Sequence, residues 1–520
     1  MSAGGRRSSW GNVFTVQNGD RYFHATDTGD LVIAEMSPKE FTEVSRTHLI
    51  DPSHHVGGRT LVWSHPAFAN RSIYLRNDWE IRCYSMKKPS DAVKLDWQIE
   101  DGNGLFDKNP IPFRVSIRSS LSDDVSGSIQ WKVEDDEGKH LSTSEQDITV
   151  TANSSTPVQR NIELPNPGFY KVIATFQSDN NGNANISNAD KSDADNSASS
   201  DIETTLSKFV GYAPEKIQVP LTRADDFDAF WDETLKTLAS IQPQFKLQRK
   251  PDRDSATHKV YEVTMRSLEN VRVRGWYEQP NDAQGVPALL RVPGYSQNMR
   301  PTGSDSPIAF FSFNVRGHGN SKDDVSGKAD YWIRGLDDKN GYYYQGAYAD
   351  CIRAVDFLMT RPEINKSRIG VTGGSQGGGL SWATAALDQR ISLCAPDIPF
   401  LCDWVKYFKA SHWPEMDKWI ADKPERTWES TLKTMSYFDT LNMADRIKCP
   451  VFMSLGVQDG ICPPATIFAV YNRLPGEKTF HAYPNAGHWA PGSHQALKTA
   501  WIASKFDSKD TESPASVGAD

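Results

Sequence analysis

One serine in this sequence is flanked by glycines where a strand-like run gives way to a helix-like run. Residues 368–380 read RIGVTGGSQGGGL, in which Gly373, Ser375 and Gly377 form a G-x-S-x-G motif. This motif places a nucleophilic serine on a sharp turn, where neighbouring side chains would collide unless they were glycine. A glycine-rich loop could instead cradle phosphate, but this one has neither the Gly-Lys-Ser/Thr ending of a P-loop nor dinucleotide spacing. The motif therefore favours Ser375 as a nucleophile.

A histidine and an acid must accompany such a serine, because a neutral hydroxyl is a weak nucleophile. Where the nucleophile follows a strand in this way, the chain order is Ser, acid, His. Asp459 follows the strand-like run 451–455, and His488 lies in the loop-like run 484–489. The order and the loop positions predict a catalytic triad of Ser375, Asp459 and His488.

The sequence also offers other roles for Asp459 and other candidates for the base. Asp459 would otherwise simply end a strand, and His481 or His494 would be the alternative base. His481 falls within a strand-like run and His494 within the first turn of a helix, so neither has the loop position of His488.

Two amide groups are expected to stabilise the oxyanion of a tetrahedral intermediate. The amide of Gln376, directly after the nucleophile, is the first candidate. The second is the amide of Tyr295, in the Pro293-Gly294-Tyr295 run that follows an apolar strand-like segment. An ordinary Pro-Gly turn is the alternative interpretation of that run.

The elements that would position these residues alternate between strand and helix. Asp226 opens a helix-like run, and a second helix-like run carries an apolar face from Cys351 to Met359. Alternating elements of this kind predict an α/β fold with a mostly parallel, doubly wound sheet, the α/β-hydrolase fold, over residues 211–510. A disordered tail is expected at 511–520. The expected core strands are 287–292, 308–315, 369–372 and 451–455.

The preceding part of the chain reads as β-rich. Short alternating runs within 89–210 predict a small, immunoglobulin-like β-sandwich. The Asn-, Asp- and Ser-rich stretch 178–205 is expected to be disordered, either as a linker or as a surface insertion within one domain. Residues 10–86 resemble the terminal blades of a PQQ-like β-propeller, especially in the runs WSHP at 63–66 and YLRN at 74–77. The resemblance covers one to two blades, so the segment 1–88 is interpreted as a truncated piece.

Bulk properties limit the classes of partner. The chain has 520 residues with a net charge of −9, which favours several domains and argues against a nucleic-acid-binding surface. No apolar run is long enough to span a membrane and no export signal is visible, which predicts a cytoplasmic protein, or a secreted one if the N-terminus is truncated. The six cysteines form no CxxC pair and are expected to be mostly buried free thiols.

With these residues placed, residues 219–506 resemble the acetyl xylan esterase and cephalosporin C deacetylase family, carbohydrate esterase family seven. The motifs that carry the resemblance are YYY at 342–344, GGSQGGG at 373–379, DIPFL at 397–401, SYFD at 436–439 and GVQDGICPP at 456–464. It implies removal of acetyl groups from xylo-oligosaccharides and from small esters such as cephalosporin C. It also implies a homo-oligomer, since family members often form hexameric rings.

The family's triad falls on the same three residues, and its oxyanion donors fall on Tyr295 and Gln376. Its Arg-Gly-Gln motif appears as Arg316-Gly317-His318, expected to support the site together with Gly373 and Gly377. Its His-Glu pair appears as His488-Trp489, and Trp489 and Pro399 are expected to line the substrate pocket.

The resulting hypothesis is a serine esterase that acts through an acyl-enzyme and needs no metal or organic cofactor. A general short-chain carboxylesterase with little sugar preference is the first alternative, which Trp489 would favour. A carbohydrate-binding or scaffold protein with a vestigial hydrolase is the second, and the intact triad argues against it.

Overall fold

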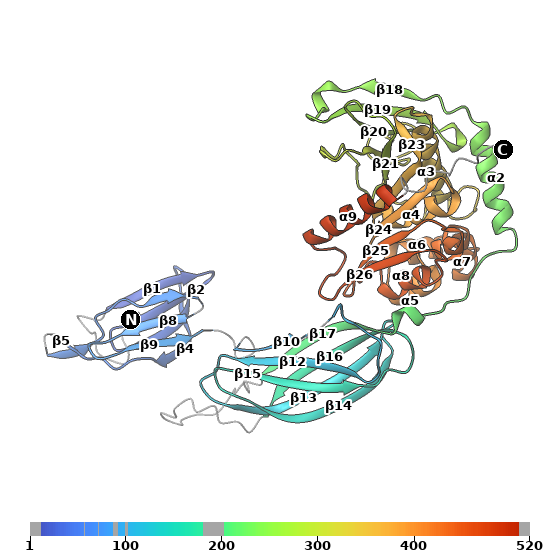
Figure 1. Ribbon diagram of the computed structural model, residues 1–520. Coiled ribbons are helices and arrows are strands. Elements are labelled where there is room, and N and C mark those ends of the chain that lie inside the picture. Colours follow the sequence, from blue (N-terminus) through green and yellow to red (C-terminus); the bar gives the residue numbers. More distant parts are fainter. Residues whose placement is uncertain are drawn as a thin grey trace, which may run out of the picture.

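The computed structural model describes residues 12–56, 58–70, 72–86, 92–98, 102–179 and 202–508. Figure 1 shows three groups of elements that follow one another along the chain: an N-terminal set of strands, a β-sandwich and a larger α/β unit. The predicted tail at 511–520 lies outside the described residues. Within the described ranges, no helix combines the length and apolar character that a membrane span requires.

The N-terminal strands build small antiparallel sheets around a small core. The first four strands pair in sequence order as a meander, and the last three form a second sheet. Only a few hydrophobic residues, such as Leu31, Ile50 and Ile73, are buried in the core, while large apolar side chains such as Trp79 are exposed. The strands are β1 (Val13–Asn18), β2 (Arg21–Thr26), β3 (Asp30–Met36), β4 (Phe41–His48), β5 (His54–Val56), β6 (Arg59–Leu61), β7 (Ala67–Ala69), β8 (Ser72–Arg76) and β9 (Ile81–Ser85).

The next unit is a two-sheet sandwich whose strands alternate buried and exposed side chains. A three-stranded sheet in the order β10-β12-β15 packs on a five-stranded sheet in the order β11-β17-β16-β13-β14. Phe113 and Trp131, from the two sheets, meet edge to face in the core at 5.8 Å between ring centroids. The strands are β10 (Val93–Trp97), β11 (Leu105–Phe106), β12 (Ile111–Ser119), β13 (Val125–Asp135), β14 (His140–Val150), β15 (Ser155–Ile162), β16 (Gly168–Ser178) and β17 (Glu203–Tyr212).

The stretch 178–205 joins two neighbouring strands of the same sheet. Strands β16 and β17 pair antiparallel along their length, and the Ser178 amide donates to the Ile202 carbonyl at 2.9 Å. The stretch is therefore an insertion within the sandwich, not a linker between domains. Its two ends are ordered in strands, contrary to the disorder expected for the whole stretch, because strand pairing satisfies their backbone groups. Residues 180–201 lie outside the described ranges.

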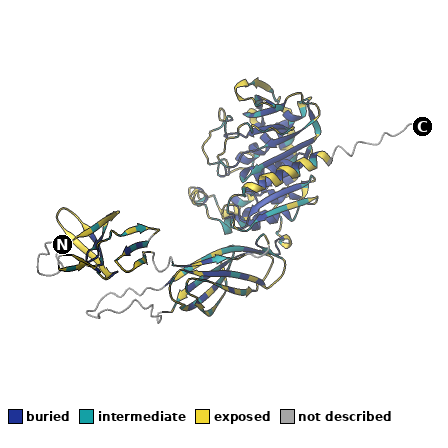
Figure 2. Ribbon diagram, turned by 60° about the vertical axis from the view of Figure 1, so that its left-hand side comes forward, coloured by how far each residue is buried: buried dark blue, intermediate teal, exposed yellow. Residues whose placement is uncertain are grey.

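The α/β unit is built on a nine-stranded sheet in the order β18-β19-β20-β22-β21-β23-β24-β25-β26. Strands from β22 to β26 pair in parallel, and the strands on the other side of β22 pair antiparallel. The strands of this sheet are largely buried (Figure 2), as strands covered on both faces must be. They are β18 (Lys246–Arg249), β19 (His258–Arg266), β20 (Arg272–Pro280), β21 (Val286–Arg291), β22 (Ala309–Asn314), β23 (Ile364–Gly374), β24 (Ile391–Asp397), β25 (Val451–Gly456) and β26 (Lys478–Tyr483).

Helices cover both faces of this sheet, which agrees with the predicted fold class. Leu290 and Val371 face the core that α3 and α4 share, while Leu289 and Leu393 face α9. Asp226 precedes the first helix without capping it; its carboxylate pairs with Lys339 instead. The helices are α2 (Phe227–Ser240), α3 (Tyr343–Thr360), α4 (Gln376–Leu387), α5 (Trp404–Ala410), α6 (Pro414–Ala421), α7 (Trp428–Met435), α8 (Pro464–Tyr471) and α9 (Gly492–Ser508).

Candidate active site

Ser375 occupies a strained turn between β23 and α4. Its backbone has φ of 57° and ψ of −121°, in the positive-φ region that side chains other than glycine rarely adopt. A Cβ on Gly373 would lie 2.6 Å from the Gly377 carbonyl oxygen, and a Cβ on Gly377 would lie 2.5 Å from the Val292 carbonyl oxygen. The two glycines predicted to allow the turn are therefore required by the packing around it.

The structure brings Ser375, His488 and Asp459 into one hydrogen-bonded chain. His488 Nε2 lies 3.0 Å from Ser375 Oγ, and His488 Nδ1 lies 2.8 Å from Asp459 Oδ2. The His488 side chain is 27% exposed, whereas the Asp459 side chain is fully buried. A neutral imidazole that donates from Nδ1 to the carboxylate can accept the serine proton at Nε2, which is the arrangement a general base needs.

The carboxylate of Asp459 is fixed by its own loop. Its Oδ1 atom accepts hydrogen bonds from the amides of Ile461 and Cys462, at 2.8 and 2.9 Å. The other oxygen is left to His488. Two amide donors hold the carboxylate in one orientation, so the loop sets the direction of the imidazole that binds to it.

The preceding residue, Gln458, ties this loop to the β-sandwich. Its side-chain amide accepts from the Phe209 amide and donates to the Phe209 carbonyl, both at 2.9 Å, and it also donates to the Pro484 carbonyl at 2.7 Å. Phe209 belongs to β17, and Pro484 begins the loop that carries His488. The sandwich thus supports both loops that bear the acid and the base, a contact the sequence analysis did not foresee.

The two amides expected to form the oxyanion hole lie in tight turns. Gly294 and Gln297 close the first turn, since the Gln297 amide donates to the Gly294 carbonyl at 3.1 Å and the Gln297 side chain accepts from the Gly294 amide at 3.1 Å. Gln376 begins α4, where a helix leaves its first amides unpaired. Within the described ranges, the amide N–H groups of Tyr295 and Gln376 meet no protein acceptor.

A buried hydrogen-bond chain lies below the Gln376 side of the site. The Gln376 side chain accepts from Tyr344 Oη at 2.9 Å, and its nitrogen lies 3.2 Å from His318 Nε2. His318 Nδ1 lies 3.3 Å from the Arg316 carbonyl, so His318 donates from Nδ1 and accepts at Nε2. Burial lowers the pKa of His318 to about 4, so the imidazole is neutral near pH 7. His318 thus supports Gln376, the residue that carries an expected oxyanion donor.

Arg316 and Gly317 hold the loop that presents His318. The buried Arg316 guanidinium forms two 3.0 Å hydrogen bonds with Asp350 and one of 2.8 Å with Glu269. Gly317 has φ of 78°, and a Cβ there would lie 2.8 Å from the Ser326 carbonyl oxygen. The loop is therefore anchored to α3 and turned sharply at Gly317.

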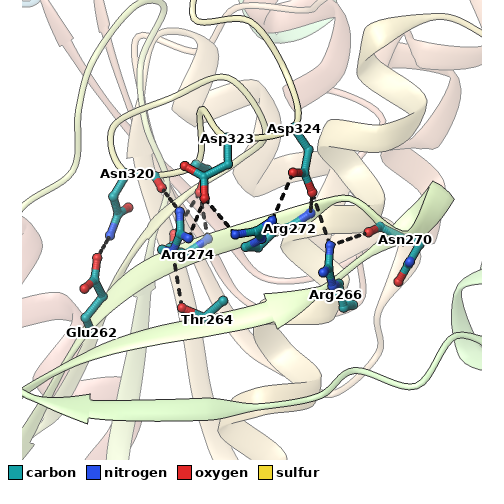
Figure 3. Close-up of polar contacts among 10 residues, drawn as sticks. Glu262, Thr264, Arg266, Asn270, Arg272, Arg274, Asn320, Asp323 and Asp324 are labelled. Atoms are coloured by element: carbon teal, nitrogen blue, oxygen red, sulfur yellow. Dashed lines mark hydrogen bonds and ion pairs between the residues drawn. The ribbon is translucent and has the colours of Figure 1, made fainter.

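An ion-pair network ties the continuation of this loop to β19 and β20 (Figure 3). Asp323 pairs with Arg274 at 2.6 Å and with Arg272 at 3.0 Å, while Asp324 pairs with Arg266 at 3.2 Å. Exposed pairs of this kind contribute little singly, but a shared network holds a loop in register. All five charged residues come from sequence positions that no motif singles out.

The two residues expected to line a substrate pocket are placed differently from each other. Trp489 is 52% exposed and directly follows His488. Pro399 is buried, and its Cα lies 2.7 Å from where a Cβ on Gly378 would sit. Pro399 therefore packs beneath helix α4 and is not open to a substrate, because the turn after β24 folds back against the nucleophile helix.

The alternative histidines are held away from Ser375. His494 Nε2 lies 2.7 Å from Asp397 Oδ1, and its Nδ1 lies 2.9 Å from Tyr483 Oη. His481 stands in β26, with its ring 4.9 Å from that of Phe452. The carboxylate of Asp397 also pairs with Lys498, so a second buried carboxylate–histidine cluster lies under α9. In the sequence, the Asp of the DIPFL run is the only sign of this cluster.

Helices α5, α6 and α7 form an insertion between β24 and β25, which the sequence analysis did not predict. It is held by aromatic packing: Phe408 stacks on Trp332 and Trp404, and Trp413 meets Trp332 edge to face at 4.4 Å. Ser411 Oγ donates to the Gly460 carbonyl at 3.3 Å, which connects the insertion to the loop of Asp459.

Known proteins with similar sequences and structures indicate the family to which this site belongs. A family model described as acetyl xylan esterase (AXE1) matches residues 202–505. The acetyl esterase Axe7A of Xylanibacter ruminicola is 30% identical over 319 residues, which cover 56% of this chain and 70% of the relative. The matched family segment contains all three members of the hydrogen-bonded chain.

Two solved structures are similar over the same share of the chain. An acetyl xylan esterase from Paenibacillus sp. R4 is 33% identical, covers 56% of this chain and 98% of its own, and has a TM-score of 0.53. Acetyl xylan esterase 1 from Thermoanaerobacterium sp. JW/SL YS485 is 28% identical with the same coverage and TM-score. From the family match and the relatives, this chain belongs to the acetyl xylan esterase family of α/β-hydrolases.

Proposed function

We propose that this protein removes acetyl groups from acetylated xylan, xylo-oligosaccharides and small acetyl esters. The observation that carries the proposal is the Ser375–His488–Asp459 chain, on a strained turn, in a member of a family of ester hydrolases. The α/β scaffold positions these three residues, and membership of the family indicates the class of substrate. Neither the sandwich nor the N-terminal strands contribute a residue to this hydrogen-bonded chain.

The reaction follows from the geometry in two steps. Ser375 Oγ attacks the acetyl carbonyl while His488 Nε2 takes the serine proton, and the amides of Tyr295 and Gln376 stabilise the oxyanion. His488 returns the proton to the sugar oxygen as it leaves, which produces acetyl-Ser375. A water molecule then attacks this ester, with His488 again as base, and releases acetate.

The decisive experiment measures acetate release from acetylated xylo-oligosaccharides and from p-nitrophenyl acetate. We expect Ser375→Ala to lower kcat by roughly 10⁴-fold or more on both substrates. Ser367→Ala is the matched control, because Ser367 lies on the same strand but is exposed at its other end. Activity that survives Ser375→Ala would overturn the mechanism, and activity on the aryl ester alone would overturn the sugar specificity.

A second candidate is a general short-chain carboxylesterase. The exposed Trp489 next to His488 favours it, since an apolar side chain there replaces the carboxylate of the family's His-Glu pair. Comparing acetyl with butyryl p-nitrophenyl esters in the wild type and in Trp489→Glu separates the candidates. A wild type that prefers butyrate, with the preference reversed by Trp489→Glu, would favour the carboxylesterase.

A further inference from the structure

A cysteine lies against the catalytic chain without having a part in the proposed reaction. Cys462 is 1% exposed and lies three residues after Asp459 in the same short loop. One ligand atom each from Asp459, Cys462 and His488 all lie within 4.8 Å of one another. Among the described residues, this is the only group of three His, Cys, Asp or Glu side chains found so close together.

These three side chains are the ligands that a thiophilic divalent cation prefers. Zinc binds cysteine sulfur at about 2.3 Å, histidine nitrogen at about 2.0–2.1 Å and carboxylate oxygen at about 2.0–2.2 Å, in a tetrahedron. Ligand atoms bound to one such ion lie roughly 3–4 Å apart, so the present spacing needs only a small contraction. Three protein ligands leave a fourth position for water or for the Ser375 oxygen.

The surroundings favour ion entry and a fixed ligand set. Asp459 and Cys462 are three residues apart in one loop, and the amide of Cys462 already donates to the Asp459 carboxylate. The His488 side chain is 27% exposed, so an ion can reach it from solvent. The thiol would release its proton to solvent when its sulfur binds the ion.

We propose that Asp459, Cys462 and His488 form an inhibitory site for a thiophilic divalent cation such as Zn²⁺. Coordination would take from His488 the nitrogen that accepts the serine proton, or the one that is held by Asp459. Either loss disables the base. Inhibition rests on the proposed esterase function, whereas metal binding does not.

Binding is tested first, with a readout that is independent of activity. Co²⁺ added to the full chain should produce a thiolate-to-cobalt charge-transfer absorption, and Zn²⁺ should displace it with one ion per chain. Cys462→Ala should lose this band, whereas Ser375→Ala should retain it. Cys83→Ala removes an exposed cysteine and should leave the band unchanged. Cys462→Ser, closer to cysteine in size, is the second variant should Cys462→Ala fold poorly. A band that persists in the folded Cys462 variant would overturn the proposal.

Inhibition is tested next with p-nitrophenyl acetate. Zn²⁺ should inhibit the wild type and Cys83→Ala reversibly, with activity restored by EDTA. The inhibition constant of a Cys462 variant, measured against its own metal-free activity, should rise by at least about tenfold. Equal inhibition of the wild type and that variant would place the metal elsewhere and overturn the site. An enzyme inactive from the start, with an intact cobalt band, would contradict the esterase function and leave the metal site supported.

Discussion

Asp459 with His488, and Asp397 with His494, are two carboxylate–histidine pairs at the ends of neighbouring strands β25 and β24. Their heavy-atom separations are nearly equal, at 2.8 and 2.7 Å. In the first pair the other imidazole nitrogen faces Ser375, and the ring is 27% exposed. In the second pair it faces the Tyr483 hydroxyl, the ring is fully buried, and Lys498 also binds the carboxylate.

The difference shows what a carboxylate–histidine pair needs in order to act as a base. The imidazole must face a nucleophile and reach solvent, so that a proton can be taken and given back. The Asp397–His494 pair has its second imidazole nitrogen occupied by Tyr483 and its carboxylate occupied by Lys498. Its role is therefore to hold α9 against the end of β24, directly behind the nucleophile turn.

The strongest test of this comparison replaces each histidine in turn. We expect His488→Ala to lower kcat by roughly 10⁴–10⁶-fold with little change in stability, because it removes the base. His494→Ala should lower kcat/KM by less than about tenfold but cost about 1–3 kcal/mol of unfolding free energy, because it leaves buried polar groups unpaired. Steady-state kinetics and urea unfolding measure both effects. A reversed pattern would exchange the roles of the two pairs.

Asp397→Asn tests the structural pair by its charge. It should cost about 3–5 kcal/mol, because Lys498 becomes a buried charge without a partner. Lys498→Met in the same chain should recover much of this loss. If Asp397→Asn unfolds at the wild-type urea concentration, the cluster does not stabilise the fold.

The Asp397 carboxylate also makes the free energy of unfolding depend on pH. Although burial opposes its ionisation, His494 and Lys498 hold the pKa of Asp397 below its usual value. Its stabilising contribution is therefore complete above the unfolded value of 3.8 and is lost as pH falls through the lower folded value. Urea unfolding of the wild type and of Asp397→Asn across this acid range should show a smaller loss in the variant.

His318 offers a third, smaller test, on the oxyanion side of the site. Because burial lowers its pKa from 6.5 to about 4, the unfolded chain binds a proton that the folded chain excludes, at a cost of about 3 kcal/mol. This cost is absent above pH 6.5 and grows as pH falls from 6.5 toward 4, so the unfolding free energy decreases over that range. His318→Gln restores the family residue and should remove this part of the pH dependence. An unchanged pH profile of unfolding free energy would show that His318 is protonated in the fold.

The smallest expected effect concerns the support of the catalytic acid. Asp397 ends a central strand, whereas Asp459 stands in a loop whose neighbour Gln458 is bound to the sandwich. Gln458→Ala should cost about 1–2 kcal/mol and lower kcat by less than about tenfold, since it leaves the Phe209 backbone groups unpaired. Lys208→Ala removes an exposed contact with Asn485 and serves as the control, with a smaller effect on both quantities. Equal effects would mean that the sandwich does not steady the acid loop.

Much of the α/β unit and of its site followed from local patterns. The G-x-S-x-G turn, the strand before it and the order of acid and base all depend on short stretches of chain, so they were predictable. The antiparallel strands β16 and β17 on either side of the 178–205 stretch were not predictable as partners. The composition of a stretch can show that it has too few apolar residues to build a core. It does not show which strands pair at the two ends of the stretch.

The sequence alone determined the nucleophile turn, because Gly373, Gly377 and the preceding strand all lie within a few residues of Ser375. It also determined the set of histidines from which a base could come. Whether His481, His488 or His494 reaches Ser375, and whether Cys462 lies beside it, depended on strand order and on the packing of α9. These are contacts between residues far apart in sequence, whose distances no local propensity controls.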